Sequence, residues 1–168
     1  MCKTCRRTSS LYAVVAPLSY EGLTKEVIRQ LKFHSGRAAV KPLTRLMTPR
    51  LKRTYAVIVP VPTATQRVRQ RGYDQAVLLA RELGRLTGSP VANVLHRNGQ
   101  AHQVGASRRQ RLRQLNEAFW VPRRANLSGK HILLVDDVVT TGATIEAAAR
   151  ALKAAGATRI SAVVVAQA

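Results

Sequence analysis

A short apolar run that ends in two adjacent acids constrains the fold more than any other feature of this sequence. The residues of 130–135 are mostly apolar, Asp136 and Asp137 follow, and a helix-type pattern begins after a polar loop. An apolar run without alternation is typical of a parallel strand buried on both faces. We therefore expect a strand over 130–135 that leaves its sheet at the two aspartates, then a loop and a helix over 144–155.

Strand-like and helix-like stretches alternate over the rest of the 168 residues, which is the length of a single domain. We expect further strands at 11–17, 55–61 and 160–166, with a candidate at 91–95. Further helices are expected at 21–33, 40–51 and 74–86. Strands and helices that alternate in this way predict an α/β fold with a mostly parallel sheet flanked by helices, and ligands at the carboxyl ends of the strands.

The loop that follows the two aspartates has the composition of an anion site. Thr140, Thr141, Gly142, Ala143 and Thr144 lie where a helix begins, and backbone N–H groups, hydroxyls and a glycine without Cβ favour a phosphate there. Carboxylates repel phosphate, so the aspartates must face something neutral or cationic that is joined to it. Sugar hydroxyls, or a metal that bridges to a second phosphate group, meet that condition. The stretch therefore predicts a phosphorylated ribose that carries a further anion.

A basic loop is expected at the same edge of the sheet. Residues 63–72 follow the predicted strand at 55–61, and they include Arg67, Arg69 and Arg71 but no acid. This loop is the candidate site for the second anion. A plainer interpretation is that the aspartates only end a strand and cap a helix, but capping accounts for one acid and one threonine, not for the whole stretch.

The stretch Ile132–Thr144, ILLVDDVVTTGAT, resembles the signature of type I phosphoribosyltransferases. Other features are similar to one branch of that family, the ComF-type competence proteins associated with DNA uptake. They are Leu31–Phe33, Val59–Pro62, Arg71–Gln75, and the set Gln103, Arg108, Arg113 and Asn116–Phe119. The likeness spans nearly the whole chain. It implies a type I phosphoribosyltransferase-like fold, with a small hood-like segment over 11–54 and a core over 55–168.

The resemblance also implies a site for phosphoribosyl pyrophosphate, or for a ribonucleotide, with Mg²⁺. Asp136 and Asp137 would be the central residues of the chemistry, binding the ribose hydroxyls and holding Mg²⁺ through the ligand, while residues 140–144 bind the 5′-phosphate. The pyrophosphate would contact Val61, Pro62, Arg67, Arg69, Arg71 and Arg108. Residues 100–116 would form a mobile loop that closes over the site. For the arginines of 108–113, nucleic-acid contact and a solvated helix face stay open as alternatives.

Cys2 and Cys5 are the only cysteines, and their C-x2-C spacing lets both thiolates reach one zinc. A structural zinc needs four ligands, so the pair supplies half a site. ComF-type proteins usually begin with two such pairs in a zinc knuckle. We therefore interpret residues 1–10 as an incomplete remnant of a knuckle, with a terminal pair that binds no metal as the alternative.

The charge balance is strongly basic, because 28 Lys and Arg stand against 8 Asp and Glu, for a net charge of +20. Phosphates of nucleic acid or of small metabolites are the abundant counterparts of such a surface. One pocket uses few of these cations, and many others lie in the amino-terminal third. They are Lys3, Arg6, Arg7, Lys25, Arg29, Lys32, Arg37, Arg50, Lys52 and Arg53. They predict a track for single-stranded DNA, unless the excess is only a compositional bias.

Two functions are compatible with this sequence. The first is Mg²⁺-dependent transfer of phosphoribose to, or from, a base or nucleotide, for which no general base stands out. The second is a non-catalytic module that keeps the pocket and acts on single-stranded DNA or a helicase partner during DNA uptake. Trp120, beside Phe119, is expected in the core rather than as a base-stacking platform. No apolar stretch is long enough to span a bilayer and none resembles a signal peptide, so we expect no membrane insertion and a cytoplasmic location.

Overall fold

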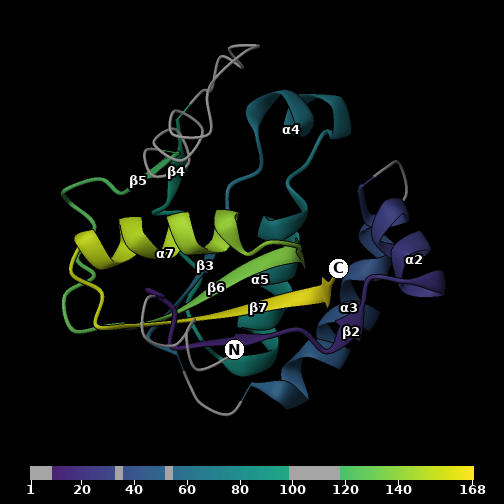
Figure 1. Cartoon of the computed structure of the whole chain (residues 1–168), viewed down its shortest axis with the longest axis horizontal. Coiled ribbons are helices and arrows are strands. Elements are labelled where there is room, and N and C mark those ends of the chain that lie inside the picture. The colour runs from purple at the N-terminus through teal and green to yellow at the C-terminus, as the bar shows by residue number, and fades with distance from the viewer. Residues whose placement is uncertain (1–8, 33–35, 52–54, 99–117) are drawn as a thin grey trace.

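A computed structural model describes residues 9–32, 36–51, 55–98 and 118–168, and a parallel sheet runs through the middle of this part of the chain (Figure 1). Its strands are β1 (Ala13–Val15), β2 (Leu18–Ser19), β3 (Val57–Pro60), β6 (His131–Val139) and β7 (Arg159–Gln167). The order is β1-β7-β6-β3, β2 also pairs with β7, and every pairing is parallel. The predicted α/β fold with a mostly parallel sheet is confirmed.

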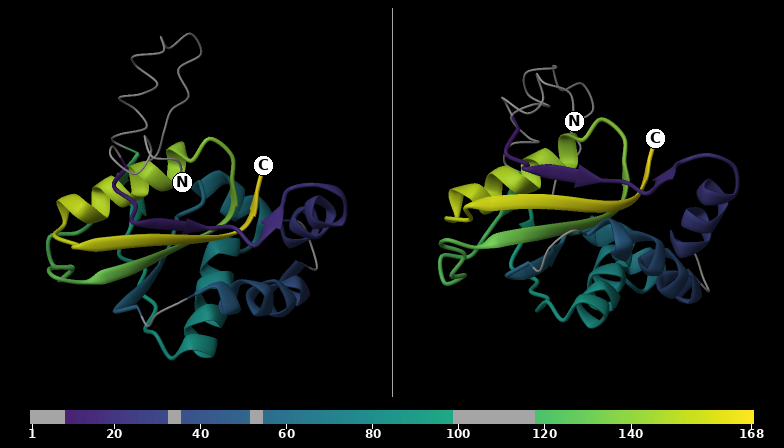
Figure 2. Two further views of the ribbon diagram at one scale, coloured as in Figure 1. Left: turned by 60° about the horizontal axis from the view of Figure 1, so that its bottom comes forward. Right: turned by 90° about the horizontal axis from the view of Figure 1, so that it is seen from below.

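Helices cover both faces of this sheet (Figure 2). The α-helices are α2 (Gly22–Lys32), α3 (Val40–Met47), α4 (Thr65–Arg71), α5 (Gln75–Thr87) and α7 (Ala143–Ala154). Successive residues of a strand point to opposite faces, so Ile132 and Leu134 pack with α7 while Leu133 and Val135 pack with α3 and α5. The sheet therefore separates two apolar cores.

Strand β6 is longer than the sequence predicted. We expected the chain to leave the sheet at the two aspartates, but β6 continues to Val139, with Asp136 paired to Val164 and Val138 paired to Ala166. The reason is the length of β7, which reaches Gln167 and offers backbone partners over the same span. Both aspartates are therefore held by the strand itself.

Prolines account for two of the four other differences from the predicted elements. The helix expected over 40–51 is α3 followed by a 3₁₀ turn, Thr48–Arg50, because Pro49 has no N–H to continue the helical bonds. The strand expected over 11–17 divides around Pro17 into β1 and β2. The candidate strand at 91–95 reduces to one bridge, between Val91 and Ile58. Residues 63–72, expected as a loop or helix entry, contain the short helix α4.

The amino-terminal segment contributes to the sheet, to its helical cover and to one end of the strands. β1 and β2 extend the sheet, and α3 packs against α5 beneath it. The last turn of α2 is fixed by the Tyr73 hydroxyl, which donates a buried hydrogen bond of 2.8 Å to the carbonyl of Leu31. This contact places the end of α2 beside the carboxyl end of β6. A separate 3₁₀ turn, Gly36–Ala39, precedes α3.

A small antiparallel ribbon lies outside the main sheet and is formed by β4 (His96–Arg97) and β5 (Phe119–Trp120). Phe119 is buried, whereas 46% of the surface of Trp120 is exposed. The expectation that Trp120 belongs to the core is therefore wrong. The cause is strand alternation, because Phe119 takes the inward position of this two-residue strand. No helix among the described residues has the length and apolarity that a bilayer crossing demands.

Candidate functional site

A pocket of about 430 Å³ lies where β3 and β6 end. It is lined by Tyr20, Lys32, Val61, Pro62, Thr63, Ala64, Arg67, Arg71, Gln75, Arg97, Asp136, Asp137, Val138, Thr140 and Thr144. The predicted loops after 55–61 and after the two aspartates thus meet in one place. This is the edge at which parallel α/β sheets bind ligands.

The structure brings most of the predicted site residues together. Those that line the pocket are Val61, Pro62, Arg67, Arg71, Asp136, Asp137, Thr140 and Thr144. Arg69 is exposed on α4 and is not among the lining residues, and neither are Thr141, Gly142 and Ala143 of the turn into α7. Arg108, the loop expected over 100–116, and Cys2 with Cys5 lie outside the described residues.

Asp74 fixes the loop that follows β3. Its side chain accepts hydrogen bonds from the backbone N–H of Thr63 at 2.9 Å and from the Thr63 hydroxyl at 3.1 Å. The same carboxylate caps α5 by accepting from the N–H of Ala76 at 2.9 Å. One acid therefore ties the start of the loop to the start of α5, which sets the position of α4 and its arginines between them.

The loop that follows β6 ends in a left-handed residue. Gly142 has φ of +77° and stands directly before α7, a conformation that a side chain would strain. This turn lets the chain pass from the strand into the helix within the three residues 140–142. As a result, Thr140 and Thr144 both line the pocket at the amino-terminal end of α7, where the helix dipole favours an anion.

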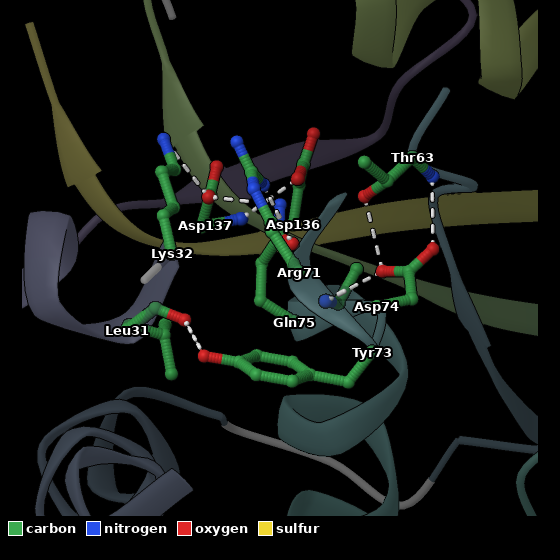
Figure 3. A network of polar contacts seen from close by, with 10 residues as sticks. Leu31, Lys32, Thr63, Arg71, Tyr73, Asp74, Gln75, Asp136 and Asp137 are labelled. Atoms are coloured by element: carbon green, nitrogen blue, oxygen red, sulfur yellow. Dashed lines mark hydrogen bonds and ion pairs between the residues drawn. The ribbon is translucent and has the colours of Figure 1, made fainter. Parts of the chain in front are cut away.

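Asp137 is the most tightly held of the pocket acids (Figure 3). Its Oδ2 forms an ion pair with Lys32 Nζ at 3.0 Å and accepts a hydrogen bond from Gln75 Nε2 at 3.2 Å. Gln75 in turn accepts from the Arg71 guanidinium at 3.0 Å. The chain of contacts from Lys32 to Arg71 therefore joins α2, β6, α5 and α4 around one carboxylate.

Asp136 lies next to this carboxylate and has a different electrostatic environment. Burial, and then the negative charge of Asp137, raise the pKa of Asp136 to about 8, although its carboxylate accepts a hydrogen bond from the N–H of Asp137. Asp136 is therefore mainly protonated at neutral pH. Lys32 is the cation paired with the neighbouring carboxylate of Asp137.

Lys32, Gln75 and Arg97 are among the pocket residues that were not assigned to this site from the sequence. Lys32 was assigned to the predicted DNA track, but it faces Asp137, and the ComF-type match at Leu31–Phe33 was the only indication of this. Gln75 belongs to another such match, and its contact with Asp137 depends on the packing of α5. Arg97 comes from β4, and its burial, with the nearby charge of Arg67, lowers its pKa below the ordinary arginine value. Nothing in the local sequence indicated Arg97.

The donor atoms of the pocket fit a Mg²⁺ ion that arrives with a phosphorylated ligand. Within the described ranges there is no group of three or more His, Cys, Asp or Glu side chains that would hold an ion by itself. The protein ligands that Asp136 and Asp137 could offer to the ion are the oxygens of their two carboxyl groups. Mg²⁺ is commonly bound by one or two carboxylates together with substrate phosphates, so this donor set is sufficient when the ligand contributes the rest.

Sequence comparison places the chain among known proteins. The family model of the phosphoribosyl transferase domain matches residues 68–168. Competence protein ComFC of Bacillus subtilis is 28% identical over 138 residues, which cover 80% of this chain and 55% of that protein. DNA utilization protein YhgH of Escherichia coli K12 is 31% identical over 157 residues, which cover 88% of this chain and 68% of that protein. The chain thus spans little more than half the length of the first of these relatives.

Solved structures show the same fold. The glutamine phosphoribosylpyrophosphate amidotransferase from Bacillus subtilis, complexed with ADP and GMP, matches with a TM-score of 0.57 at 21% identity, over 77% of this chain and 26% of that one. Adenine phosphoribosyltransferase from Thermoanaerobacter pseudethanolicus matches with a TM-score of 0.52 at 15% identity, over 78% of this chain and 81% of that one. The phosphoribosyltransferase-like fold expected from the sequence is confirmed.

We predict that Asp136→Asn changes how stability depends on pH. A carboxyl whose folded pKa is raised stabilises the fold only while it is protonated. The free energy of unfolding of the wild type therefore falls as the pH rises from the ordinary pKa near 3.8 to about 8. The variant lacks this loss. Its free energy of unfolding should gain on wild type by at most about 1.4 kcal/mol per pH unit in that window, as measured by urea unfolding. Parallel stability curves for the two proteins would contradict the assignment.

A double-mutant cycle tests the ion pair of Lys32 and Asp137. Lys32→Met alone should cost about 1 to 3 kcal/mol of unfolding free energy, because it leaves a buried carboxylate without its cation. Adding Asp137→Asn should recover part of that cost, which gives a coupling of about 1 kcal/mol or more in urea unfolding at neutral pH. The matched control is the exposed pair of Arg29 and Glu26, at 3.7 Å, whose coupling should stay below about 0.5 kcal/mol. Equal coupling energies in the two cycles would show that burial does not strengthen the ion pair of Lys32 and Asp137.

Proposed function

Because this chain belongs to the phosphoribosyl transferase domain family, with competence and DNA utilization proteins among its relatives, we propose that its pocket binds phosphoribosyl pyrophosphate together with Mg²⁺. One observation carries the proposal: two carboxylates stand between a threonine-bearing helix start and an arginine-bearing loop in a single pocket. This order matches a ligand with a phosphate at one end, hydroxyls in the middle and a pyrophosphate beyond. The size of the pocket, about 430 Å³, lies within the range typical of small-molecule sites.

Each part of this ligand has residues suited to it. Thr140 and Thr144, at the start of α7, suit the 5′-phosphate. Arg67 and Arg71 suit the pyrophosphate, since guanidinium groups bind phosphate oxygens with two parallel hydrogen bonds. Arg97 adds a third cation at the same pocket. The arginines of the pocket therefore come from two elements, α4 and β4, on the side of β3.

The two aspartates suit the ribose in different ways. Asp137 is paired with Lys32, and its carboxylate oxygens are suited to accept hydrogen bonds from hydroxyls. Asp136, in its neutral form, can donate one hydrogen bond and accept another. Mg²⁺, bound through these oxygens and the ligand's phosphates, would supply positive charge against the pyrophosphate. Lys32 lies 3.0 Å from Asp137, so its positive charge offsets the negative charge of the acid pair.

A transfer reaction from this pocket would depend on charge stabilisation. The departing pyrophosphate gains negative charge, and Arg67, Arg71 and Arg97 are placed to stabilise it. Neither a histidine nor a cysteine is among the described residues that line the pocket, and both aspartates are used for the ribose. The proposal therefore includes no general base from this part of the chain, and the acceptor would supply its own nucleophilic nitrogen.

A second function is favoured by the names of the relatives and by the net charge of +20. In this alternative the domain keeps the pocket for binding and works in DNA uptake, through single-stranded DNA or a helicase partner, without transferring phosphoribose. Both functions share the ligand and differ in whether pyrophosphate is released. The charge exceeds what the pocket uses, so a nucleic-acid surface is compatible with either function.

Binding is tested by calorimetry with Mg²⁺ and phosphoribosyl pyrophosphate. Asp136→Asn combined with Asp137→Asn should leave a folded chain with much weaker affinity, because the carboxyl hydrogen bonds to the ribose are lost at about 0.5 to 3 kcal/mol each. Arg67→Gln should weaken binding by about 10-fold or more. Arg69→Gln is the matched control, since Arg69 lies on the same short helix but does not line the pocket. Unchanged affinity in the double aspartate variant would overturn the proposed site.

Catalysis is tested by pyrophosphate release from Mg²⁺ and phosphoribosyl pyrophosphate against a panel of free bases. Each reaction is run with and without single-stranded DNA. Release that depends on one base, and that is lost in the double aspartate variant, would support the enzyme. Tight binding with no release above the rate of the ligand alone would support the binding module instead.

A further inference from the structure

A second hollow, of about 560 Å³, lies at the other end of α7 from the pocket. It is formed between the segment after β5 and the last turns of that helix. Trp120, Pro122 and Arg123 line one side, and Ala151, Ala154 and Ala155 line the other. Ala151, which lines the hollow, follows Thr144, which lines the pocket, by seven residues of α7, an axial rise of about 10 Å. Figure 1 shows β5 beside the carboxyl-terminal half of α7.

The aromatic wall of this hollow is held in place before any ligand arrives. His96 and Trp120 are paired across the β4–β5 ribbon, and their rings stack with centroids 4.6 Å apart and planes inclined by 25°. Stacking fixes the indole ring while 46% of the residue stays exposed. A fixed aromatic ring binds a flat group at little cost in conformational entropy. Proline and alanine side chains add apolar surface without filling the space.

The surroundings of the hollow are basic. None of the described residues that line it is acidic, and Arg123 is one of them. Arg124, Arg150 and Lys153 are exposed nearby, on the same segment and on α7. The acid of α7, Glu146, lies in its first turn at the pocket end, where it accepts hydrogen bonds from Ser9 and Ser10. Positive charge around a flat apolar site complements a ligand that joins an aromatic base to phosphate.

Half of the amino-terminal track expected from the sequence, namely Lys3, Arg6, Arg7, Lys52 and Arg53, lies outside the described residues. Among its described members, two are engaged by acids. Lys32 is used by Asp137, and Arg29 is paired with Glu26 on the same helix. Glu21 and Glu26 are both exposed at or near α2, in a chain with only 8 acids. Any surface that includes α2 therefore carries negative as well as positive charge, whereas the described lining of the hollow carries no negative charge.

We propose that this hollow binds an unpaired nucleobase of single-stranded DNA on Trp120, with Arg123 and Arg124 at the adjoining phosphates. The inference gives the DNA-binding alternative a location and does not depend on what the pocket binds. Base stacking on an aromatic ring is tolerant of sequence, because every base presents a flat face. Arginine contacts to the backbone are likewise independent of sequence.

The chain contains a single tryptophan, which makes Trp120 a reporter for its own site. We expect an oligodeoxythymidylate of about ten nucleotides to quench tryptophan fluorescence in a saturable way. Thymidine monophosphate is the second arm, because it offers the same base without the strand. Quenching by the oligonucleotide at much lower concentration than by the mononucleotide would support a strand-binding site. Equal potency of the two would overturn it in favour of a free-nucleotide site.

Variants are measured by anisotropy of a labelled oligonucleotide. Trp120→Ala should weaken binding by about 5- to 150-fold, and Trp120→Tyr should retain most of it. Tyr12→Ala is the matched control, because Tyr12 is also an exposed aromatic residue and lies beneath the guanidinium of Arg159, but it does not line the hollow. Arg123→Gln and Arg124→Gln should each reduce the slope of log affinity against log salt by about 0.7.

Four further results would overturn the proposal. They are no binding of the oligonucleotide at moderate salt, binding without a change in tryptophan fluorescence, equal affinity of Trp120→Ala and wild type, and a fluorescence change on raising protein concentration alone. The last result would assign the hollow to a second copy of the chain. Calorimetry of Trp120→Ala with Mg²⁺ and phosphoribosyl pyrophosphate, expected to match wild type, separates failure of this site from failure of the pocket.

Discussion

The parallel pairing of β6 between β3 and β7 is the interaction on which the rest of this structure depends. Ile132, Leu133, Leu134 and Val135 are almost completely buried, and each such side chain contributes about 1.5 to 3 kcal/mol. Because β7 extends to Gln167, β6 stays in the sheet past these residues and carries Asp136 and Asp137 with it. Strand alternation continues through the two acids, so Asp137 points toward the side of α5, where Gln75 and Lys32 meet it. The sheet, not a loop, therefore positions the two carboxylates.

Two adjacent carboxylates at a buried strand end are electrostatically costly, and the neighbouring residues reduce that cost. Lys32 and Gln75 contact one carboxylate, and the raised pKa of Asp136 keeps a proton on the other. Removing water from an unpaired carboxylate costs several kcal/mol, so apolar packing alone would not favour this arrangement. The same network explains why the end of α2 lies beside the two aspartates. Its last turn is fixed by Tyr73, and it brings the one lysine that the acid pair needs.

Local patterns in the sequence predicted the features that depend on neighbouring residues. The apolar run before the aspartates, the threonine and glycine turn and the helix over 144–155 are found in the structure because burial, turn chemistry and helix periodicity act within a few residues. The full length of β6 was missed because it depends on β7, whose paired residues lie 28 positions further along the chain, as Val164 does from Asp136. The roles of Lys32 and Arg97 were missed because both depend on tertiary packing. Trp120 was assigned to the core because apolar composition does not indicate which face of a two-residue strand points inward.

Helix α7 connects the two surfaces that we propose for anionic ligands. Its buried face is made largely of small residues, among them Ala147, Ala148 and Ala149, which let the helix lie close to the sheet and restrict its movement. One end presents threonines to the pocket, and the other presents alanines to the hollow beside Trp120. Thr144 at the pocket and Ala151 at the hollow are joined by about 10 Å of this helix, which keeps their separation constant. Two ligands bound at its ends would therefore not compete for the same atoms, and a strand that passed from one end to the other would span the helix without distorting it.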